Sequence, residues 1–291
     1  MTIEATAEAL QTVEATAEAA ATVTAEALQT VEATAEAAAT VTAEALQTVE
    51  ATVEATGVQK FFSEIGDAFY QNFIAEDRWK YLTDGLANTL LITLFALLLG
   101  LLLGFLIAMI RATHDKTGKL KVLNFFAKIY LTVIRGTPVV VQLLIIYFVI
   151  FGSVNIDKMF VAVLAFGLNS GAYVAEIVRS GIMSIDNGQF EAGSSLGFNY
   201  AQTMVSIILP QAFKNILPAL ANEFIVLLKE TSVAGYIALE DLTKGGDIIR
   251  SQTYEAFLPL IAVAIIYLVM VMFLTHLVSK LERRLAKNDK R

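Results

Sequence analysis

EAGSSLGFNYAQTMVSIILP, the stretch from Glu191 to Pro210, connects two long hydrophobic runs and indicates how the chain is organised around a membrane. It begins with polar and small side chains (Ala, Gly, Ser and Ser at 192–195) and becomes apolar towards its end. Small side chains let the backbone of another protein approach closely. We therefore expect residues 186–210 to form a docking loop at one face of the membrane instead of a span.

Two capping patterns predict a pair of short helices within this loop. A capping residue stands three positions before a glutamine at Asp186 and again at Asn199, a spacing that allows each pair to cap a helix start reciprocally. The first helix is expected over 187–196 and should stop at Gly197, because glycine readily adopts the left-handed conformation that ends helices. The second is expected over 200–208, ending before the proline that closes the stretch.

The composition is that of an integral membrane protein. Of 291 residues, 56% are hydrophobic and 17% are charged, and the mean hydropathy is +0.63. The sequence has no cysteine, which excludes disulfides, thiolate metal sites and cysteine nucleophiles. The net charge of −7 combines unlike parts, because residues 1–59 hold ten glutamates and no lysine or arginine.

The acidic segment 1–59 is a low-complexity repeat. The unit EALQTVEATAEAAATVTA begins at Glu8 and again at Glu26, and a truncated copy begins at Glu44. Threonine and valine lower helix propensity and large apolar side chains are few, so we expect a disordered tail. Residues 60–85 are predicted to form an amphipathic segment in the membrane interface. Its apolar side chains at three- and four-residue steps are Phe62, Ile65, Phe69 and Phe73.

Five hydrophobic runs are predicted to cross the membrane within a transmembrane domain over 86–280. The expected spans are residues 86–110, 139–154, 159–182, 211–228 and 257–278. Basic residues outnumber acidic ones after the first span and in the tail 281–291, so the positive-inside rule places both in the cytoplasm. The amino terminus is then expected outside and the carboxyl terminus inside.

Polar residues interrupt three of these spans. Arg135, Gly136, Thr137 and Pro138 are predicted to break the helix at the edge of the second span. Asn169, Tyr173 and Glu176 share one face of the third, and Asn222 and Glu223 lie in the fourth. A carboxylate is expensive to bury in lipid, so Glu176 must face protein or water. An ion pair with Arg179 and contact with a substrate satisfy that requirement equally well.

Three stretches resemble the permeases of ABC importers. The first is the stretch from Glu191 to Pro210, which resembles the family's cytoplasmic coupling signature. Within it, Gly193 stands where the family usually has alanine, and this glycine should loosen the first loop helix by up to about 1 kcal/mol. The segments Arg135–Leu143 and Leu217–Ser232 are similar to the permeases of polar amino acid importers of the histidine, glutamine and arginine uptake group. The positions that match the family's coupling signature are Glu191, Ala192, Gly197, Ile207, Leu209 and Pro210.

The resemblance implies an all-α, five-helix permease of the type I importer kind in a bacterial inner membrane. It implies a second permease copy, identical or different, a pair of cytosolic ATPase subunits that bind ATP and Mg, and an extracytoplasmic solute-binding protein. The 186–210 loop would couple the permease to the ATPases. Asn169, Tyr173, Glu176, Asn222 and Glu223 are the candidates for contact with a polar amino acid.

Several classes of function lack their motifs in this sequence. There is no G-x-x-x-x-G-K-[ST] phosphate loop, no nucleophilic triad motif and no metal-ligand cluster, so we expect a non-catalytic chain without a cofactor of its own. The basic residues are explained by topology, not by nucleic acid binding. The alternative is an ATP-independent channel or secondary amino acid carrier, whose flux would respond to ion gradients.

Overall fold

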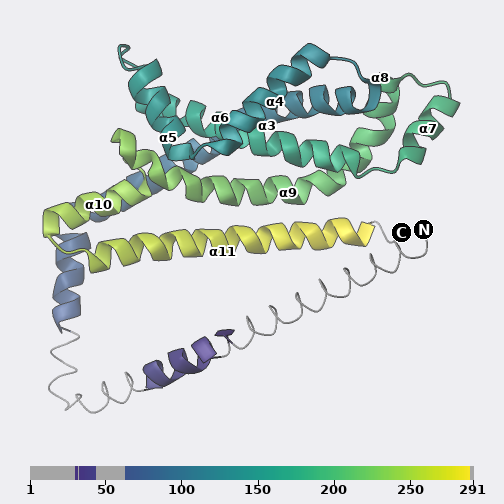
Figure 1. The fold of residues 1–291 in the computed structure, drawn as a ribbon. Coiled ribbons are helices and arrows are strands. Elements are labelled where there is room, and N and C mark those ends of the chain that lie inside the picture. Colours follow the sequence, from purple (N-terminus) through teal and green to yellow (C-terminus); the bar gives the residue numbers. More distant parts are fainter. Residues whose placement is uncertain (1–29, 32, 44–62, 289–291) are drawn as a thin grey trace, which may run out of the picture. The chain divides into compact units, whose positions relative to one another are not determined.

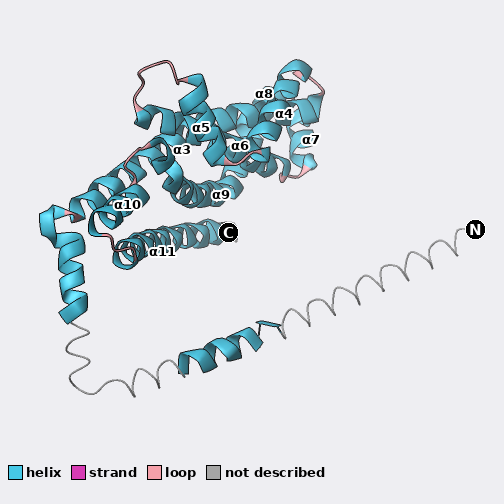
Figure 2. Cartoon of the chain, turned by 60° about the vertical axis from the view of Figure 1, so that its left-hand side comes forward, coloured by secondary structure: helices cyan, strands magenta, loops and turns pink. Residues whose placement is uncertain are grey.

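A computed structural model describes residues 30–31, 33–43 and 63–288 of the chain, with side chains up to residue 285. The described residues form helices and connecting turns without a strand (Figures 1 and 2). The chain divides into two compact units, Met1–Asp67 and Ala68–Arg291. In the first unit, residues 33–43 are helical with exposed side chains. Most of the predicted tail, and Phe62 of the interfacial segment, lie outside the described residues.

The second unit contains the membrane helices. Among the described residues, four helices are long and apolar enough to cross a membrane, and a fifth crossing results if a sharply bent helix pair counts as one span. This confirms the predicted all-α membrane architecture. The four long helices are α3 (Trp79–Thr117), α6 (Lys158–Met183), the continuous helix Tyr200–Ile237 and α11 (Phe257–Asn288). The helix Tyr200–Ile237 consists of α8 (Tyr200–Thr203), η4 (Met204–Ile208), α9 (Leu209–Glu230) and η5 (Thr231–Ile237).

The second span differs from the predicted run over 139–154. Helix α4 (Lys121–Gly136) bends by 108° into α5 (Val139–Leu144), which continues as the π-helix η3 (Ile145–Ile150). The part after the bend is too short to cross a hydrocarbon core of about 30 Å at 1.5 Å per residue. A crossing therefore needs α4, whose lysines had been counted with the cytoplasmic loop after the first span.

The most extensive contact between two helices joins α3 to α6. A Cβ added at Gly100 would lie 3.0 Å from the Ser170 side chain, and one at Gly104 would lie 2.5 Å from Val174. Ala108 of the same stripe is fully buried in a core cluster with Val174. Small residues on α3 thus let the two helices approach closely, as in other membrane bundles.

Helix α10 (Leu242–Thr253) packs on the amino-terminal end of α3. Its residues lie between the predicted fourth and fifth spans, for which the sequence had indicated only a loop. The Thr89 hydroxyl accepts a hydrogen bond from the Leu242 amide at 3.0 Å. A Cβ at Gly85 would meet the Asp241 carbonyl oxygen at 2.6 Å, so only glycine permits this approach.

The segment before α3 turns sharply at η1 (Tyr70–Ile74) and η2 (Ala75–Asp77). Its apolar residues do not share one environment, because Phe73 is buried beside α10 and α11 whereas Phe69 is half exposed. The two rings still contact each other, with centroids 5.0 Å apart. The π-helical turn shifts the register that a regular helix would have kept.

The second predicted loop helix does not end before Pro210. The helix continues through η4 into α9, and Pro210 lies in the first turn of α9. Proline lacks an amide hydrogen, and the first turn of a helix tolerates that loss. The preceding π-turn changes the hydrogen-bond register at the same point, so the two helices merge without a break.

Candidate coupling elbow and polar membrane sites

Residues 186–210, called the elbow below, form α7 (Asn187–Ser195), a glycine turn, α8, η4 and the first two residues of α9. Gly197 has φ +81°, and the amide of Phe198 donates to the Gly193 carbonyl while that of Gly197 donates to Ser194. These are the two bonds of a Schellman motif, which satisfies the last carbonyls of α7. The predicted stop at Gly197 is confirmed.

The two predicted caps have different outcomes. Asn199 and Gln202 form the full reciprocal capping box, with both bonds at 2.9 Å. The Asp186 side chain caps the Gly188 amide at 2.6 Å. Within the described elbow, the Gln189 side chain does not cap Asp186 in return. Its side-chain oxygen instead accepts a hydrogen bond from the Gln211 side-chain amide at 3.2 Å.

Helix α7 lies at one end of the second unit, and α10 lies at the other (Figure 1). The candidate residues Glu191, Ala192 and Gly197 are exposed, and Leu196 is 71% exposed in an otherwise polar segment. An exposed leucine next to small side chains suits contact with a partner's groove. Of the remaining coupling candidates, Gly193 is buried, Pro210 is exposed, and Ile207 and Leu209 are half buried.

Gly193 has a structural role that its sequence context did not reveal. A Cβ at this position would lie 2.6 Å from both Cγ2 and Oγ1 of Thr203. Thr203 is itself 2% exposed. Glycine at 193 therefore allows α7 to close onto α8, and the predicted loosening of α7 is offset by this contact.

The elbow is fastened to the carboxyl-terminal end of α3. The Phe190 and Tyr200 rings stack with centroids 6.4 Å apart, and the Lys116 ammonium lies 4.6 Å above the Phe190 ring. Lys116 also donates to the Asn187 side chain at 2.5 Å. A displacement of the elbow would therefore act directly on α3.

The predicted break at 135–138 lies where α4 meets α5. Thr137 is extended and Pro138 precedes the first turn of α5, so Ile134 and Thr137 have carbonyls without helical partners. The Gln142 amide donates to these carbonyls at 2.7 and 3.0 Å. Its oxygen accepts from Asn169 at 3.3 Å. Gln142 was part of the family-like R-G-T-P-x-x-V-Q-L stretch but was not singled out as a site residue.

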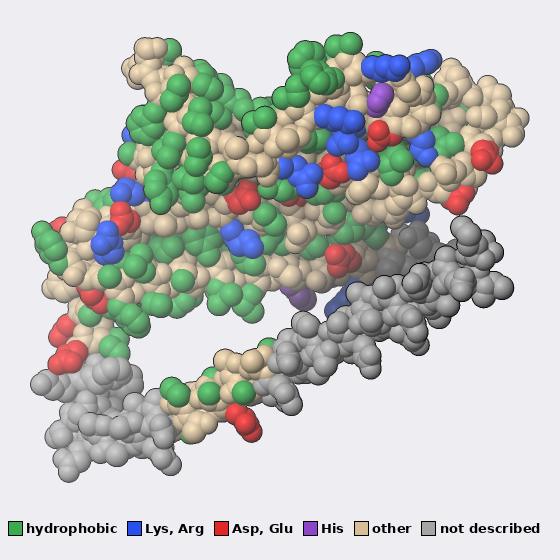
Figure 3. Space-filling view, viewed as in Figure 1, with side chains coloured by type: hydrophobic (Ala, Val, Ile, Leu, Met, Phe, Trp, Pro, Cys, Tyr) green, Lys and Arg blue, Asp and Glu red, His purple; other side chains and the backbone are tan. Residues whose placement is uncertain are grey.

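Glu176 lies at the centre of an ion cluster between α3, α4 and α6. Its carboxylate is 2.6 Å from Arg179, 3.2 Å from Arg111 and 3.6 Å from Arg135. Arg179 also reaches Asp115 at 3.4 Å. Figure 3 shows charged side chains gathered on this part of the surface. Of the two environments open for Glu176, the ion pair with Arg179 is present.

Of the other pathway candidates, Tyr173 borders this cluster through Arg135, and no hydrogen bond or ion pair among the described residues joins Asn169, Asn222 or Glu223 to it. Glu223 is buried and accepts a 2.8 Å hydrogen bond from Ser170, which joins α9 to α6. Asn169 is buried beside Gln142. Tyr173 is 36% exposed with Arg135 5.7 Å from its ring, and Asn222 is exposed. Three of the five candidates, Asn169, Glu176 and Glu223, therefore contact other residues of this chain, whereas Tyr173 and Asn222 are exposed.

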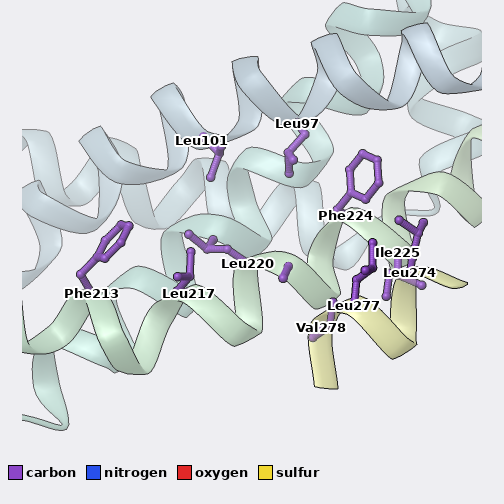
Figure 4. A pocket seen from close by; sticks show the side chains of 11 residues that line it. Leu97, Leu101, Phe213, Leu217, Leu220, Phe224, Ile225, Leu274, Leu277 and Val278 are labelled. Carbon is purple, nitrogen blue, oxygen red and sulfur yellow. The ribbon is translucent and has the colours of Figure 1, made fainter. Parts of the chain in front are cut away.

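A cavity of about 470 Å³ opens between α3, α9 and α11 (Figure 4). Its lining has no charged side chain and no polar side chain, so it offers nothing that would recognise a polar amino acid. Among the described residues, no group of three or more His, Asp or Glu could hold a metal ion. The lining residues are Leu97, Leu101, Phe213, Leu217, Leu220, Ala221, Phe224, Ile225, Leu274, Leu277 and Val278.

Comparison with known families decides the identity of this membrane fold. Residues 100–287, more than half of the chain, match the model of the binding-protein-dependent transport system inner membrane component family. The chain belongs to this family. Family members are non-catalytic permease subunits of ABC importers, with the ATPase on a separate protein. The predicted kinship with the permeases of polar amino acid importers is confirmed by the relatives that follow.

Two relatives illustrate this kinship. The permease is 43% identical over 176 residues to the arginine transport system permease protein ArtQ of Bacillus subtilis, covering 60% of this chain and 80% of the relative. It is 39% identical over 167 residues to the glutamine transport system permease protein GlnP of Escherichia coli K12, covering 56% and 76%.

Solved structures show the same kinship. The crystal structure of an amino acid ABC transporter with histidines contains a chain that is 44% identical to this permease. The two chains superpose with a TM-score of 0.66, covering 73% of this chain and 98% of that one. An inward-facing MetNI methionine ABC transporter is 18% identical with a TM-score of 0.63, covering 72% and 98%, and shows the shared fold.

Proposed function

We propose that this permease takes up a polar amino acid by alternating access and is driven by separate ATPase subunits that push on the elbow. The observation that carries the proposal is the exposed, doubly capped helix α7, which is closed by Gly197 and fastened to α3. It offers a rigid element where small and apolar groups face outward. Those groups would enter a groove of the ATPase.

The orientation follows from charge. Arg111, Lys116, Lys119, Lys121 and Lys128 lie near the α3–α4 turn, at the end of the unit that also carries the elbow. By the positive-inside rule this end is cytoplasmic, with the amino terminus outside and the carboxyl terminus inside. The end that carries α10 would then face the extracytoplasmic solute-binding protein.

The substrate pathway is assigned to the polar face of α9. Asn215, Asn222 and Lys229 recur at steps of seven and are all exposed, although α9 belongs to a membrane-spanning helix. Such a stripe is unfavourable against lipid. A second permease copy, identical or related, would cover it and enclose a polar pathway. Tyr173 and Asn222 are the candidates most open to substrate, whereas Glu176 and Glu223 are held by internal partners.

Uptake by proteoliposomes that contain the permease with its ATPase tests the proposal. Gly197→Val places a β-branched residue at φ +81°, and Gly118→Val imposes the same kind of strain at φ +67°, where α3 ends outside the elbow. We expect the first variant to insert normally but to lose ATP-driven uptake, and the second to keep more of it. Equal uptake by the two variants would contradict the proposal that the ATPase subunits act through the elbow. Uptake that persists without ATP and follows an ion gradient would favour a secondary carrier.

A further inference from the structure

A polar pocket of about 420 Å³ lies between α3 and α4, apart from the elbow and from the polar face of α9. Three of its six lining side chains are cationic: Arg111, Lys128 and Arg135. The others are Leu131, Thr132 and Gly136. The pocket has no role in the proposed transport cycle.

The positive charge around this pocket is only partly neutralised. Arg111, Arg135 and Arg179 share the single carboxylate of Glu176, and Asp115 adds one further carboxylate through Arg179. Lys128 has no hydrogen-bond or ion-pair partner among the described residues. Four cations therefore face two carboxylates, which leaves the pocket with excess positive charge.

The Arg111 side chain at this pocket is incompletely paired. Its side chain is only 17% exposed, and its Nε lies buried without a hydrogen-bond partner within the described part of the chain. A buried guanidinium nitrogen normally has an acceptor, because leaving one unpaired costs about 1–3 kcal/mol or more. Protein atoms cover this Nε, so an oxygen-rich anion in the pocket would be bound by Lys128 and by the terminal guanidinium nitrogens of Arg111, one of which already pairs with Glu176.

The position of the pocket suits a lipid headgroup. Arg111 lies seven residues before the turn at Gly118, and Lys128 lies eight residues after Leu120. At 1.5 Å per residue both lie about 10–12 Å along their helices from that turn. Long cationic side chains at this depth extend towards the headgroup layer.

An apolar surface lies next to the cations on the same helix. Val122, Phe125 and Phe126 of α4 are between 60% and 70% exposed, and Ile129 and Val133 continue this face. Lys121, Lys128 and Arg135 form a basic stripe along one side of it, since they recur at seven-residue steps. A basic stripe beside exposed aromatic and aliphatic side chains is the pattern of a helix that contacts anionic lipid.

We propose that the pocket binds the phosphate group of an anionic phospholipid, with Lys128 and Arg111 as donors and the apolar face of α4 against the acyl chains. Charge complementarity selects this occupant over a zwitterionic lipid, whose own ammonium would meet the unpaired positive charge. A second copy of the chain would cover the apolar face but would leave the cations without an anion.

The test is a lipid titration of the purified full chain in detergent, followed by thermal unfolding and by native mass spectrometry. Phosphatidylglycerol is expected to raise the unfolding midpoint and to remain bound, whereas phosphatidylcholine is not. Lys128→Gln should raise the phosphatidylglycerol concentration for half-maximal effect roughly tenfold, the expected loss of one charge-assisted contact. Lys119→Gln removes an equal charge in the α3–α4 turn, outside the pocket, and should leave the titration unchanged. Lys128→Arg should retain binding even if the glutamine variant folds poorly.

Five outcomes would overturn the proposal. They are equal responses to the two lipids, an equal loss in the Lys128→Gln and Lys119→Gln variants, and loss of binding in a well-folded Lys128→Arg variant. The fourth is saturation by inorganic phosphate alone, which would indicate a site for a free anion. A lipid effect that occurs only together with dimer formation, measured by light scattering, would assign the face to a second copy instead. None of these readouts depends on transport.

Discussion

Gly193 and Thr203 form a contact whose strength can be measured directly. An alanine methyl at 193 would lie 2.6 Å from two Thr203 side-chain atoms, Cγ2 and Oγ1, and 3.1 Å from a third, Cβ. Comfortable carbon contacts lie at about 3.5–4.0 Å. Overpacking of this kind lowers the free energy of unfolding by about 1–3 kcal/mol, and the better helix propensity of alanine offsets up to about 1 kcal/mol of that loss. We therefore expect Gly193→Ala to destabilise the elbow by about 1–2 kcal/mol.

A double-mutant cycle isolates this contact. Thr203→Ala removes the two atoms at 2.6 Å, so the Gly193→Ala/Thr203→Ala variant should recover part of the loss, with a coupling energy of about 1 kcal/mol. Thermal unfolding of the purified permease and ATP-driven uptake provide the readouts, and 1 kcal/mol corresponds to about 2–4 °C for a domain of this size. Additive losses in both readouts would refute the packing argument. Gly193→Ala with unchanged stability and uptake would also refute it.

Three further predictions concern other parts of the permease. Glu176→Gln should destabilise it by about 1–3 kcal/mol, because Arg111 and Arg179 lose their shared carboxylate, and adding Arg135→Gln should recover part of the unfolding midpoint. Gln142→Leu should lower the midpoint by a similar amount, since two carbonyls at the helix break lose their donor, and Gln142→Glu should not restore it. Burial raises the pKa of the Asp241 carboxyl to about 6, above its ordinary value of 3.8, so the stability that its proton contributes is fully present below about pH 3.8 and is lost as pH rises through 6. The unfolding midpoint should accordingly fall between pH 5 and 7, and Asp241→Asn, which can still cap α10, should flatten this part of the pH profile.

The local part of the elbow could be predicted because its signals act over a few residues. The Asn199 capping box and the left-handed Gly197 each require only neighbouring amides and carbonyls, and both are present. The third span was predicted over 159–182 from its long apolar run, and α6 covers Lys158–Met183, with the Asp157 side chain capping its first turn. Patterns of this kind do not depend on the rest of the fold.

Helices α4 and α10 escaped prediction because their character depends on long-range packing. Lys121, Lys128 and Arg135 interrupt the apolar residues of α4 every seven positions, so α4 lacks an unbroken hydrophobic run, and its packing on α3 and α6 becomes visible only in the structure. Helix α10 is polar outside, and its buried side holds Leu242 and Ile249 against the start of α3. A sequence pattern cannot specify which distant helix will cover such a short apolar side.

The partners of the polar membrane residues were equally inaccessible from the sequence. Helical periodicity placed Asn169 and Glu176 on one face, yet Asn169 contacts Gln142 whereas Glu176 contacts three arginines. The role of Gly193 required knowledge that Thr203, ten residues away, would fill the space of a methyl group. The bend at Pro138 brings Gln142 to Asn169, the turn at Gly197 brings Thr203 to Gly193, and the packing of α3 on α6 brings Arg111 to Glu176.

Cross-linking to the ATPase tests the docking of the elbow most directly. The chain has no native cysteine, so Ser194→Cys in α7 and Ser251→Cys in α10 each introduce a single thiol, and both serines are exposed. With its ATPase present, the permease should cross-link through residue 194 and not through residue 251. A membrane-impermeant maleimide added outside intact cells should label only residue 251. Labelling of residue 194 from outside, or the reverse cross-linking pattern in a transport-competent complex, would contradict the assignment of α7 as the element on which the ATPase acts.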